Sequence, residues 1–436
     1  MRSRVRAPSA PLFERLRAGP LGQRDFRFLF LGRTTSFLGN AFANVALAFA
    51  VLDLTGSKAD LGFVLAARAL PQIVFLLVGG IWADRLPRHR VMVASNVMSG
   101  VSQGAIAVLL LTGHARVWQL AALGAINGLS SAFFFPAATG IVPQTVPQQL
   151  LQPANAILRL GQNSSWIAGA AAGGLVVAAT SPGVGIAVDA ASFFAAALFL
   201  ALIHLPSTLK MEASNFFAEL REGWREFSVR TWLWVIVLQF GFVNAVELGV
   251  QGVLGPAIAK DHLGGAAAWG LILTAESIGL IVGGLILLRF RPQRLLLTAT
   301  IGVLLTMPFL LGLAGPMPVV VLIGLAALAG IGTETFGIMW DTTMQQEIPQ
   351  EKLSRVYSYD ALGSWVLIPL GLAVAGPVAE LIGTRETILA ATAISLTATL
   401  AVLFVSDVRT ISRRAAGDRP AAHPVPQGGL GEHPSA

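Results

Sequence analysis

The sequence predicts an all-α membrane protein with twelve transmembrane helices in two pseudo-symmetric six-helix bundles. Hydrophobic residues make up 54% of the 436 positions and charged residues only 12%, which is too apolar for a soluble globule. Apolar runs of about twenty residues recur, and each can cross about 30 Å of hydrocarbon. A phrase at 144–151, Gln-Thr-Val-Pro-Gln-Gln-Leu-Leu, returns at 346–353 as Gln-Glu-Ile-Pro-Gln-Glu-Lys-Leu, which indicates two fused halves.

The expected spans lie between short polar connections, and their positions define the domains. They are 27–52, 59–82, 91–112, 117–142, 154–179, 184–205, 231–256, 265–288, 294–314, 318–343, 357–382 and 386–405. We expect a cytoplasmic N-terminal segment (1–26), an N-terminal bundle (27–205), a linker (206–230), a C-terminal bundle (231–405) and a disordered cytoplasmic tail rich in Pro and Gly (406–436).

The linker contains a pattern typical of an amphipathic helix. Phe216, Phe217, Leu220, Trp224 and Phe227 fall at helical spacing, with charged residues between them. This pattern favours a helix lying on the lipid surface, and a helix that binds a protein partner is the alternative.

The distribution of basic residues predicts the orientation. Most Lys and Arg residues fall in the segments on the side of the two termini, whereas the opposite loops hold only Lys58, Arg116, Lys260 and Arg385. By the positive-inside rule both termini are cytoplasmic, and the protein is expected in the bacterial plasma (inner) membrane as a multi-pass chain. The net charge of +7 is thus explained by topology, and no nucleic-acid partner is expected.

The sequence offers no chemistry for an enzyme or a metal centre. Cysteine is absent and the six His residues are scattered, so no metal site is expected. No Gly-x-Ser-x-Gly elbow, phosphate-binding loop or His cluster is present, and we expect neither catalysis nor a cofactor.

Ionisable residues inside the spans are the main functional candidates, because charge in hydrocarbon is costly. Arg68 and Glu276 fall near the middle of the membrane in matching helices of the two halves, Glu247 in the outer half and Glu334 in the inner half. Uncharged candidates at cavity depth are Asn40, Asn44, Asn127 and Asn244.

Four further charged residues, Arg33, Arg159, Asp341 and Asp360, lie near the cytoplasmic face. They could form salt bridges that break when an inner gate opens. For all these ionisable groups, pairing for helix packing or snorkelling to the headgroups is the structural alternative.

The loop after the second span carries the most specific motif. It contains Gly80, Asp84, Arg85, Arg88 and Arg90 in the order Gly-Ile-Trp-Ala-Asp-Arg-Leu-Pro-Arg-His-Arg. This order resembles the signature of the major facilitator superfamily, although a Pro stands where that family usually has a Gly. The resemblance implies a cytoplasmic gate, and a purely topogenic Arg cluster is the alternative.

A second motif lies in the fifth span, where Ser165-Trp-Ile-Ala-Gly169-Ala-Ala-Ala-Gly173-Gly174 is similar to the antiporter motif of drug exporters. Ser165 and Ala170 replace its first Gly and its Pro. Small residues on one face let neighbouring helices approach closely.

Four further sequence segments narrow the resemblance to one branch of the family. They are Leu-Gly-Arg-Thr-Thr-Ser-Phe-Leu-Gly-Asn at 31–40, Phe-Phe-Phe-Pro at 133–136, Val-Asp-Ala-Ala-Ser-Phe-Phe at 188–194 and Ser-Tyr-Asp-Ala-Leu-Gly-Ser at 358–364. Together these look like the enterobactin-exporter and macrolide-efflux branch over roughly 20–405. The resemblance implies a carrier that expels small amphipathic molecules. We expect it to function as a monomer in the lipid bilayer. The basic residue that many proton-coupled exporters carry in the fourth span is missing.

Our hypothesis is proton-coupled efflux by alternating access, in which Glu247 or Glu276 binds a proton in exchange for substrate. An importer of a small polar nutrient on the same fold is the alternative, and a membrane enzyme is a third reading that lacks any supporting motif.

Overall fold

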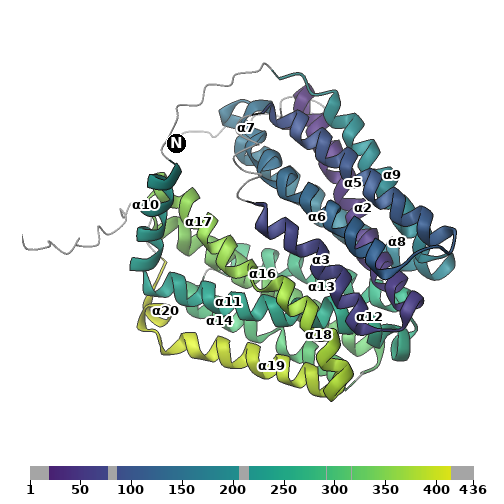
Figure 1. The fold of residues 1–436 in the computed structure, drawn as a ribbon. Coiled ribbons are helices and arrows are strands. Elements are labelled where there is room, and N and C mark those ends of the chain that lie inside the picture. Colours follow the sequence, from purple (N-terminus) through teal and green to yellow (C-terminus); the bar gives the residue numbers. More distant parts are fainter. Residues whose placement is uncertain (1–18, 77–85, 206–215, 291, 316, 414–436) are drawn as a thin grey trace, which may run out of the picture.

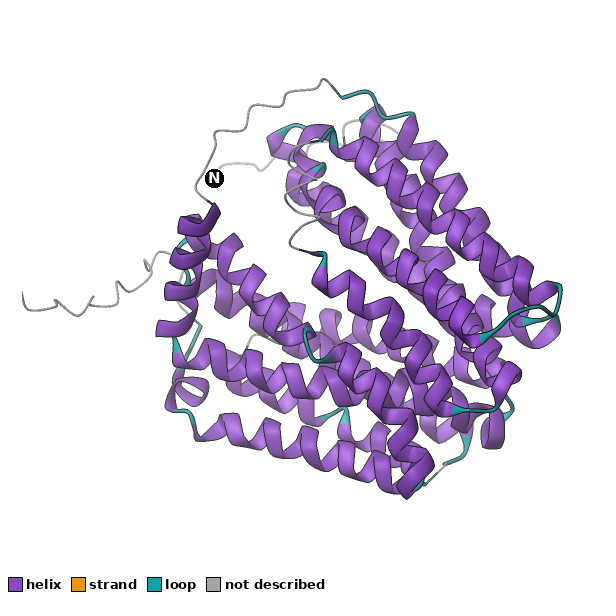
Figure 2. Cartoon of the chain, in the orientation of Figure 1, coloured by secondary structure: helices purple, strands orange, loops and turns teal. Residues whose placement is uncertain are grey.

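The computed structural model describes residues 19–76, 86–205, 216–290, 292–315 and 317–413. Within these ranges the chain is helical, with short connecting loops (Figure 2). Helices satisfy the backbone hydrogen bonds within each segment, as hydrocarbon requires. The only strand-like contact in the described ranges is an isolated bridge between Arg294 and Ser412.

Among the described residues, the N-terminal half contains six long helices, one short helix and two 3₁₀ turns, of which η1 (Pro20–Gly22) precedes the first helix. Their bounds are α2 (Arg24–Thr55), α3 (Lys58–Val74), α5 (Arg88–Leu111), α6 (Val117–Gly140), α7 (Val142–Thr145), α8 (Leu151–Ala179) and α9 (Pro182–Ala201), with the 3₁₀ turn η2 (Gln148–Leu150) before α8.

Local signals fix the tight turn between α2 and α3. Gly56 ends α2 in the left-handed region at φ 69°, which a residue with a side chain rarely adopts. The hydroxyl of Ser57 then accepts a hydrogen bond from the backbone N–H of Asp60 at 3.1 Å and caps α3.

The C-terminal half is less regular. Its elements are α11 (Thr231–Gly249), the π-helical turn η3 (Val250–Leu254), α12 (Gly255–Ile258), the π-helical turn η4 (Ala259–Leu263), α13 (Ala266–Arg289), α14 (Leu295–Leu304), α15 (Met307–Ala314), α16 (Val319–Glu347), α17 (Gln350–Trp365), α18 (Ile368–Ile382) and α19 (Thr384–Ala401).

Two spans of this half are interrupted, and each interruption has an identifiable cause. The ninth span divides into α14 and α15, and the eleventh into α17 and α18. Pro308 and Pro369 lie at the start of the second helix in each case. Proline lacks an N–H group and clashes with the preceding turn, so the helix breaks there.

Ten segments of the described chain are long and apolar enough to cross a membrane. The other two of the twelve expected spans correspond to α3, described over 17 residues, and to the 29-residue α8. Most helices begin and end within a few residues of the predicted limits. The seventh span continues further, to Leu263, and the eleventh begins earlier, at Gln350, because polar helical turns extend the apolar runs.

The packing of the helices repeats from one half to the other. In the N-terminal half α2 packs against α8 and α9, α6 against α3 and α5, and α5 against α9. The matching pairs in the C-terminal half are α11 with α17, α18 and α19, α16 with α13 and α14, and α15 with α19. The two halves meet through α3 with α18 and through α8 with α13 (Figure 1). These two contacts are equivalent, because α3 corresponds to α13 and α8 corresponds to α18. Two structurally related bundles are therefore confirmed.

The repeated phrase occupies equivalent places in the two bundles. Pro147 precedes the turn that leads into α8, and Pro349 is the residue before α17. The apolar residues before them, Val146 and Ile348, are both buried. The repeat therefore marks the connection between the fourth and fifth helices of each half.

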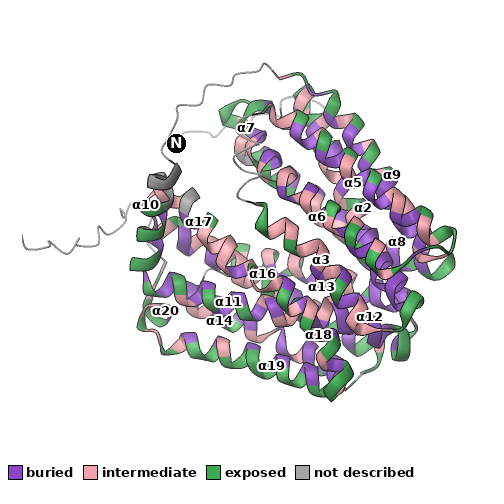
Figure 3. Cartoon of the chain, in the orientation of Figure 1, coloured by how far each residue is buried: buried purple, intermediate pink, exposed green. Residues whose placement is uncertain are grey.

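The perimeter of the bundles is apolar and exposed, as a lipid-facing surface requires (Figure 3). Val320, Leu381 and Phe404 are 80%, 83% and 86% exposed. After α19, the chain forms the short helix α20 (Ser406–Thr410), and Arg413 donates its backbone N–H to Gln293. Ordered chain thus continues into the predicted tail as far as residue 413, because α20 packs against α14.

The close approach of α8 and α13 gives a first prediction. A Cβ atom on Gly270 would lie 2.5 Å from the carbonyl oxygen of Ala170, whereas one on Gly324, which is exposed, would meet nothing within 4 Å. Ala favours helix over Gly by about 1 kcal/mol, but overpacking costs about 1–3 kcal/mol. Gly270→Ala should therefore lower the melting temperature of the purified protein, and Gly324→Ala should leave it equal or higher. Equal melting temperatures for both variants would show that this contact is not tight.

Candidate functional site

A cavity of about 550 Å³ lies between the two halves. The N-terminal half contributes Asn44, Arg68 and Trp166, and the C-terminal half contributes Gln251, Trp269 and Glu276. A volume of this size suits a small organic molecule, and the mixture of aromatic walls with a few polar points is typical of ligand sites.

Arg68 and Glu276 occupy equivalent positions in the two bundles. A Cβ on Gly128 of α6 would lie 1.9 Å from the carbonyl oxygen of Arg68, and one on Gly330 of α16 would lie 2.0 Å from that of Glu276. The same helix crossing thus fixes both residues, and each faces the cavity. The symmetric position carries a cation in one half and an acid in the other.

The two charges have different surroundings. The Nη2 atom of Arg68 donates a hydrogen bond to Oδ1 of Asn40 at 3.0 Å, and its charge also acts on Asp189. Glu276 accepts a hydrogen bond from Gln251 and faces the like charge of Glu247. The groups that act on the arginine thus belong to its own half, whereas the C-terminal side of the cavity is acidic.

Glu247 lies behind the cavity wall and joins three helices. Its Oε1 accepts hydrogen bonds from Oγ1 of Thr306 at 2.8 Å and from Oγ of Ser395 at 3.3 Å. These hydroxyl groups satisfy a carboxyl group that the helix would otherwise leave in an apolar interior.

The four predicted asparagines lie in different environments. Asn40 contacts Arg68, and Asn44 lines the central cavity. Asn127 has no exposed surface, and neither of its side-chain polar atoms has a hydrogen-bond partner among the described residues. Asn244 donates to the carbonyl oxygen of Ser364 at 3.0 Å and thereby joins α11 to α17.

The residues predicted for the cytoplasmic gate are only partly described. Gly80, Asp84 and Arg85 lie outside the described residues. Arg90 is exposed at the start of α5, and Arg88 donates to the carbonyl oxygen of Gly140.

Arg33 binds near the same helix end. Its Nη1 donates to the carbonyl oxygen of Ala138 at 3.2 Å. Arg33 and Arg88 thus both bind carbonyl groups in the last turn of α6, where the helix carries partial negative charge.

On the C-terminal side, acids join α16 to α17. Asp341 accepts a hydrogen bond from the hydroxyl of Tyr357 at 2.9 Å, and Asp360 accepts one from Nε1 of Trp340 at 3.0 Å. These bonds lie within one half.

Arg159 and Glu334 are placed on different halves and interact only through their charges. The salt bridges predicted to open and close an inner gate therefore stay a prediction.

The glycines of the antiporter-like motif are packing positions. A Cβ on Gly169 would lie 2.4 Å from that of Ala41, and one on Gly173 would lie 3.0 Å from Cα of Phe42, both on α2. A Cβ on Gly174 would lie 2.6 Å from the carbonyl oxygen of Ala266 on α13. The stripe lets α8 pack closely on its own bundle and on the other half.

Polar contacts between the halves gather at the face opposite α10 (Phe216–Val229), near α12 in Figure 1. Lys260 pairs with Asp53 at 2.6 Å and donates to the carbonyl oxygen of Leu52 at 2.7 Å.

A second group of contacts lies at the same face. Glu380 accepts hydrogen bonds from Oγ of Ser57 at 2.9 Å and from the backbone N–H of Ala59 at 3.0 Å, and Lys58 donates to Thr384 at 2.9 Å. Glu380 is thus bound to the N-terminus of α3, which favours an anion. We call these two groups of contacts the outer latch, because the predicted topology places this face outside the cell.

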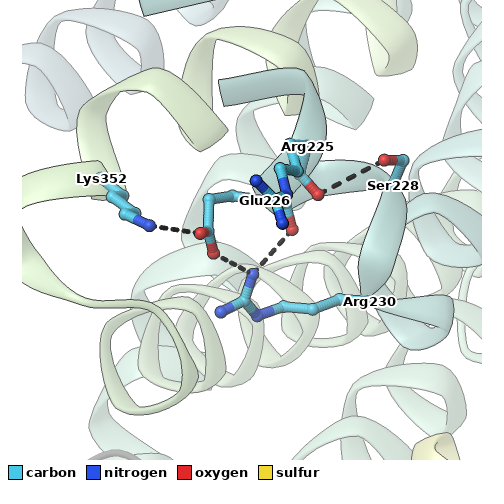
Figure 4. A network of polar contacts seen from close by, with 5 residues as sticks. All are labelled: Arg225, Glu226, Ser228, Arg230 and Lys352. Atoms are coloured by element: carbon cyan, nitrogen blue, oxygen red, sulfur yellow. Dashed lines mark hydrogen bonds and ion pairs between the residues drawn. The ribbon is translucent and has the colours of Figure 1, made fainter. Parts of the chain in front are cut away.

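At the other face, α10 is bound to the C-terminal half (Figure 4). Glu226 pairs with Arg230 at 2.7 Å and with Lys352 of α17. Burial would raise the pKa of Glu226, but hydrogen bonds from these two cations, together with their charges, lower it below its ordinary value.

Aromatic contacts strengthen the same attachment. The rings of Trp224 and Phe227 lie 5.7 Å and 5.9 Å from that of Tyr359. The linker thus contains a helix from Phe216 to Val229 whose C-terminal part packs on the protein, and its place on the lipid surface stays a prediction.

Sequence reasoning missed Asp189, Glu380 and the two tryptophans of the cavity. Asp189 is the only ionisable residue within α9 (Pro182–Ala201), and that isolation was a usable signal. The contacts of Glu380 join residues more than three hundred positions apart, so no local pattern could reveal them.

Two related six-helix bundles around a central cavity define a membrane carrier. The chain belongs to the Major Facilitator Superfamily, whose sequence profile matches residues 29–359. Such proteins are transporters and not enzymes.

Relatives and solved structures agree with this assignment. The chain is 28% identical over 372 residues to the multidrug efflux pump Tap of Mycolicibacterium fortuitum, covering 82% of this chain and 89% of the pump. It is 23% identical over 397 residues to macrolide efflux protein A of Streptococcus pyogenes (88% and 97%), and 26% identical over 370 residues to the enterobactin exporter EntS of Escherichia coli O127:H6 (81% and 87%). The predicted resemblance to this branch is confirmed.

The fold is shared with distant transporters. The crystal structure of the nucleoside transporter NupG superposes with a TM-score of 0.70 at 15% identity, covering 87% of this chain and 98% of NupG. A bacterial homologue of the iron transporter ferroportin in an inward-facing state gives a TM-score of 0.68 at 17% identity, with coverage of 87% and 98%.

The outer latch gives a second prediction. Exposed pairs contribute roughly 0.2–1 kcal/mol each, so removing both groups should shift the equilibrium toward opening of this face by about two- to thirtyfold. The chain has no native Cys, so Ser277→Cys, which lines the cavity, can be labelled without background. An impermeant maleimide applied to intact cells should label it faster when Glu380→Gln and Lys260→Gln are added.

The matched control is Asp261→Asn, an exposed neighbour of Lys260, which should not change the labelling rate. Unchanged labelling in the double latch variant would show that these contacts do not hold the face closed.

Proposed function

We propose that this protein is a proton-coupled exporter of small amphipathic molecules, working by alternating access. The observation that carries the proposal is the central cavity, which combines two tryptophans with an acid and a cation at the midpoint of the fold. An apolar, aromatic cargo with a polar group would find partners for both parts in this cavity. The names of the relatives, which include macrolide and multidrug efflux, favour export.

The arrangement of contacts supports an alternating cycle. The outer latch joins the halves at one face, while α10 lies at the other. If both termini are cytoplasmic, the latched face is the outer one. The structure then represents the stage of the cycle in which the cavity accepts cargo from inside the cell. Rocking of the halves would then break the latch and open the cavity outward.

The test is accumulation of radiolabelled erythromycin in an efflux-deficient bacterial host. Cells that express the protein should accumulate less of the macrolide, and an uncoupler should abolish the difference, because the proton gradient drives export. Higher accumulation on expression would indicate import, and a difference that survives the uncoupler would contradict proton coupling. A panel of other amphipathic antibiotics covers the case in which erythromycin is not a substrate.

The acidic side of the cavity gives a separate prediction about coupling. Glu276 faces the cavity, and Glu247 lies behind the cavity wall, where its charge acts on Glu276. Either residue could bind the proton that exchanges for cargo. Glu276→Gln and Glu247→Gln should each keep exchange of cargo without a gradient and reduce pH-driven efflux in vesicles at least tenfold if the residue carries the proton. Asp261→Asn, an exposed acid, is the control. Unaltered coupling in both Gln variants would exclude these two residues.

A further inference from the structure

The sixth span holds a carboxyl group with unusual surroundings. Asp189 of α9 has no exposed surface, and it is the only buried acid in the part of the chain that the structure describes. Neither of its carboxyl oxygens has a hydrogen-bond partner there. An ionised carboxylate in such an interior is costly unless a proton or a nearby cation neutralises it.

The neighbours of Asp189 leave one cation within reach. On α2, a Cβ on Gly39 would lie 2.7 Å from Oδ1 of Asp189, which shows how closely the two helices enclose the carboxyl group. The helix α9 also packs on α5 and α8, but the charge that acts on Asp189 is that of Arg68 on α3. Arg68 itself donates to Asn40, the residue next to Gly39. One guanidinium therefore acts on two acceptors, an amide to which it donates a hydrogen bond and a carboxyl group that it affects only through its charge.

A polar side pocket adjoins this group inside the N-terminal half. It has a volume of about 170 Å³, and its polar lining includes Ser36, Asn40, Arg68, Ser95, Asn96 and Ser99. This is room for several water molecules. The buried Oδ1 of Asn96 has no protein partner among the described residues, which is the kind of atom that water satisfies.

The side pocket adjoins the substrate cavity and reaches to within one helical turn of Asp189. It shares Asn44, Arg68 and Trp166 with the central cavity, and Phe193, one helical turn from Asp189, lines it. Water in the side pocket would lie within one helical turn of Asp189 and outside the substrate cavity, and Arg68 lines both spaces.

We propose that Asp189 is a proton-binding residue of the transport cycle and that Arg68 is its positioning partner. In the protonated state Arg68 is held by Asn40 and presents its charge to the cavity. When the carboxyl O–H gives its proton to water in the side pocket, the guanidinium moves from Asn40 to the carboxylate and its charge leaves the cavity. One proton is released and one ion pair forms, so the charge at the substrate site changes with the protonation of Asp189.

The proposal rests on the proposed function of proton-coupled transport, and it adds a coupling group in the half that lacks Glu247 and Glu276. The symmetry of the fold supports it. Glu247 lies where α11 meets α19, and Asp189 lies where the matching helices α2 and α9 meet. Hydroxyl groups hold the first acid, whereas a single cation can reach the second.

The first test needs no substrate. Infrared difference spectra of the full-length protein in liposomes, recorded between alkaline and acid pH, should show the C=O stretch of a protonated carboxyl group that shifts in D₂O. The band should disappear in Asp189→Asn and remain in Asp261→Asn, whose carboxyl is exposed. Asp189→Ser serves as a second variant should the amide not fold. A band that is unchanged in a folded Asp189 variant overturns the proposal.

Arg68 is tested by the pH at which this band appears. Arg68→Gln should move that pH, and Arg68→Lys should restore it, because only the lysine keeps a cation beside Asp189. A role of Arg68 in packing alone would leave the pH unchanged in both variants.

The second test measures coupling in reconstituted vesicles with radiolabelled erythromycin. Asp189→Asn should keep exchange without a gradient and reduce pH-driven accumulation at least tenfold. Full coupling in Asp189→Asn overturns the proposal. If the wild type moves neither erythromycin nor another antibiotic, the proposed function fails, and the infrared band still decides whether Asp189 binds a proton.

Discussion

The structure depends on close backbone contact between its halves at two symmetric seams. At one seam, a Cβ on Gly62 of α3 would lie 2.4 Å from the carbonyl oxygen of Leu372, and one on Gly376 of α18 would lie 2.1 Å from that of Lys58. Gly270 makes the corresponding contact of α13 with α8. Lipid tails provide no hydrophobic drive for helix association, so such tight packing must hold the halves together. Smooth contact surfaces without side chains also let the halves tilt against one another, and the cavity lies between the seams.

The second constraint is the cost of charge inside the bundles, and the structure meets it differently in each half. In the C-terminal half hydroxyl and amide groups bind Glu247 and Glu276. In the N-terminal half an arginine serves both an amide and a buried carboxyl group. The symmetric helix crossings place Arg68 and Glu276 at the same depth, so the fold supplies the positions and the sequence of each half supplies the charge.

Much of the fold follows from apolar runs and from one repeated phrase. The spans were predictable because hydrocarbon imposes a minimum length, and the equivalence of Arg68 and Glu276 because the surrounding residues align between halves. The outer latch was not predictable, since Lys260 and Glu380 find their partners only when distant segments meet. The importance of Asp189 was hidden for a different reason. The sequence gives its depth in the membrane, but not that both of its oxygens face a packed interior beside a polar pocket.

The attachment of α10 to α17 has a mechanical consequence. Because Glu226 and the rings of Trp224 and Phe227 bind this helix to the C-terminal half, it travels with that half as a rigid extension. The covalent connection between the end of α9 at Ala201 and the start of α10 at Phe216 is then residues 202–215, whose fully stretched contour is roughly 50 Å. However far the halves tilt, the ends of α9 and α10 cannot separate by much more than this length. The attachment of α10 thus shortens the free connection between the bundles, and the length of this connection is an upper limit on how far the carrier can open.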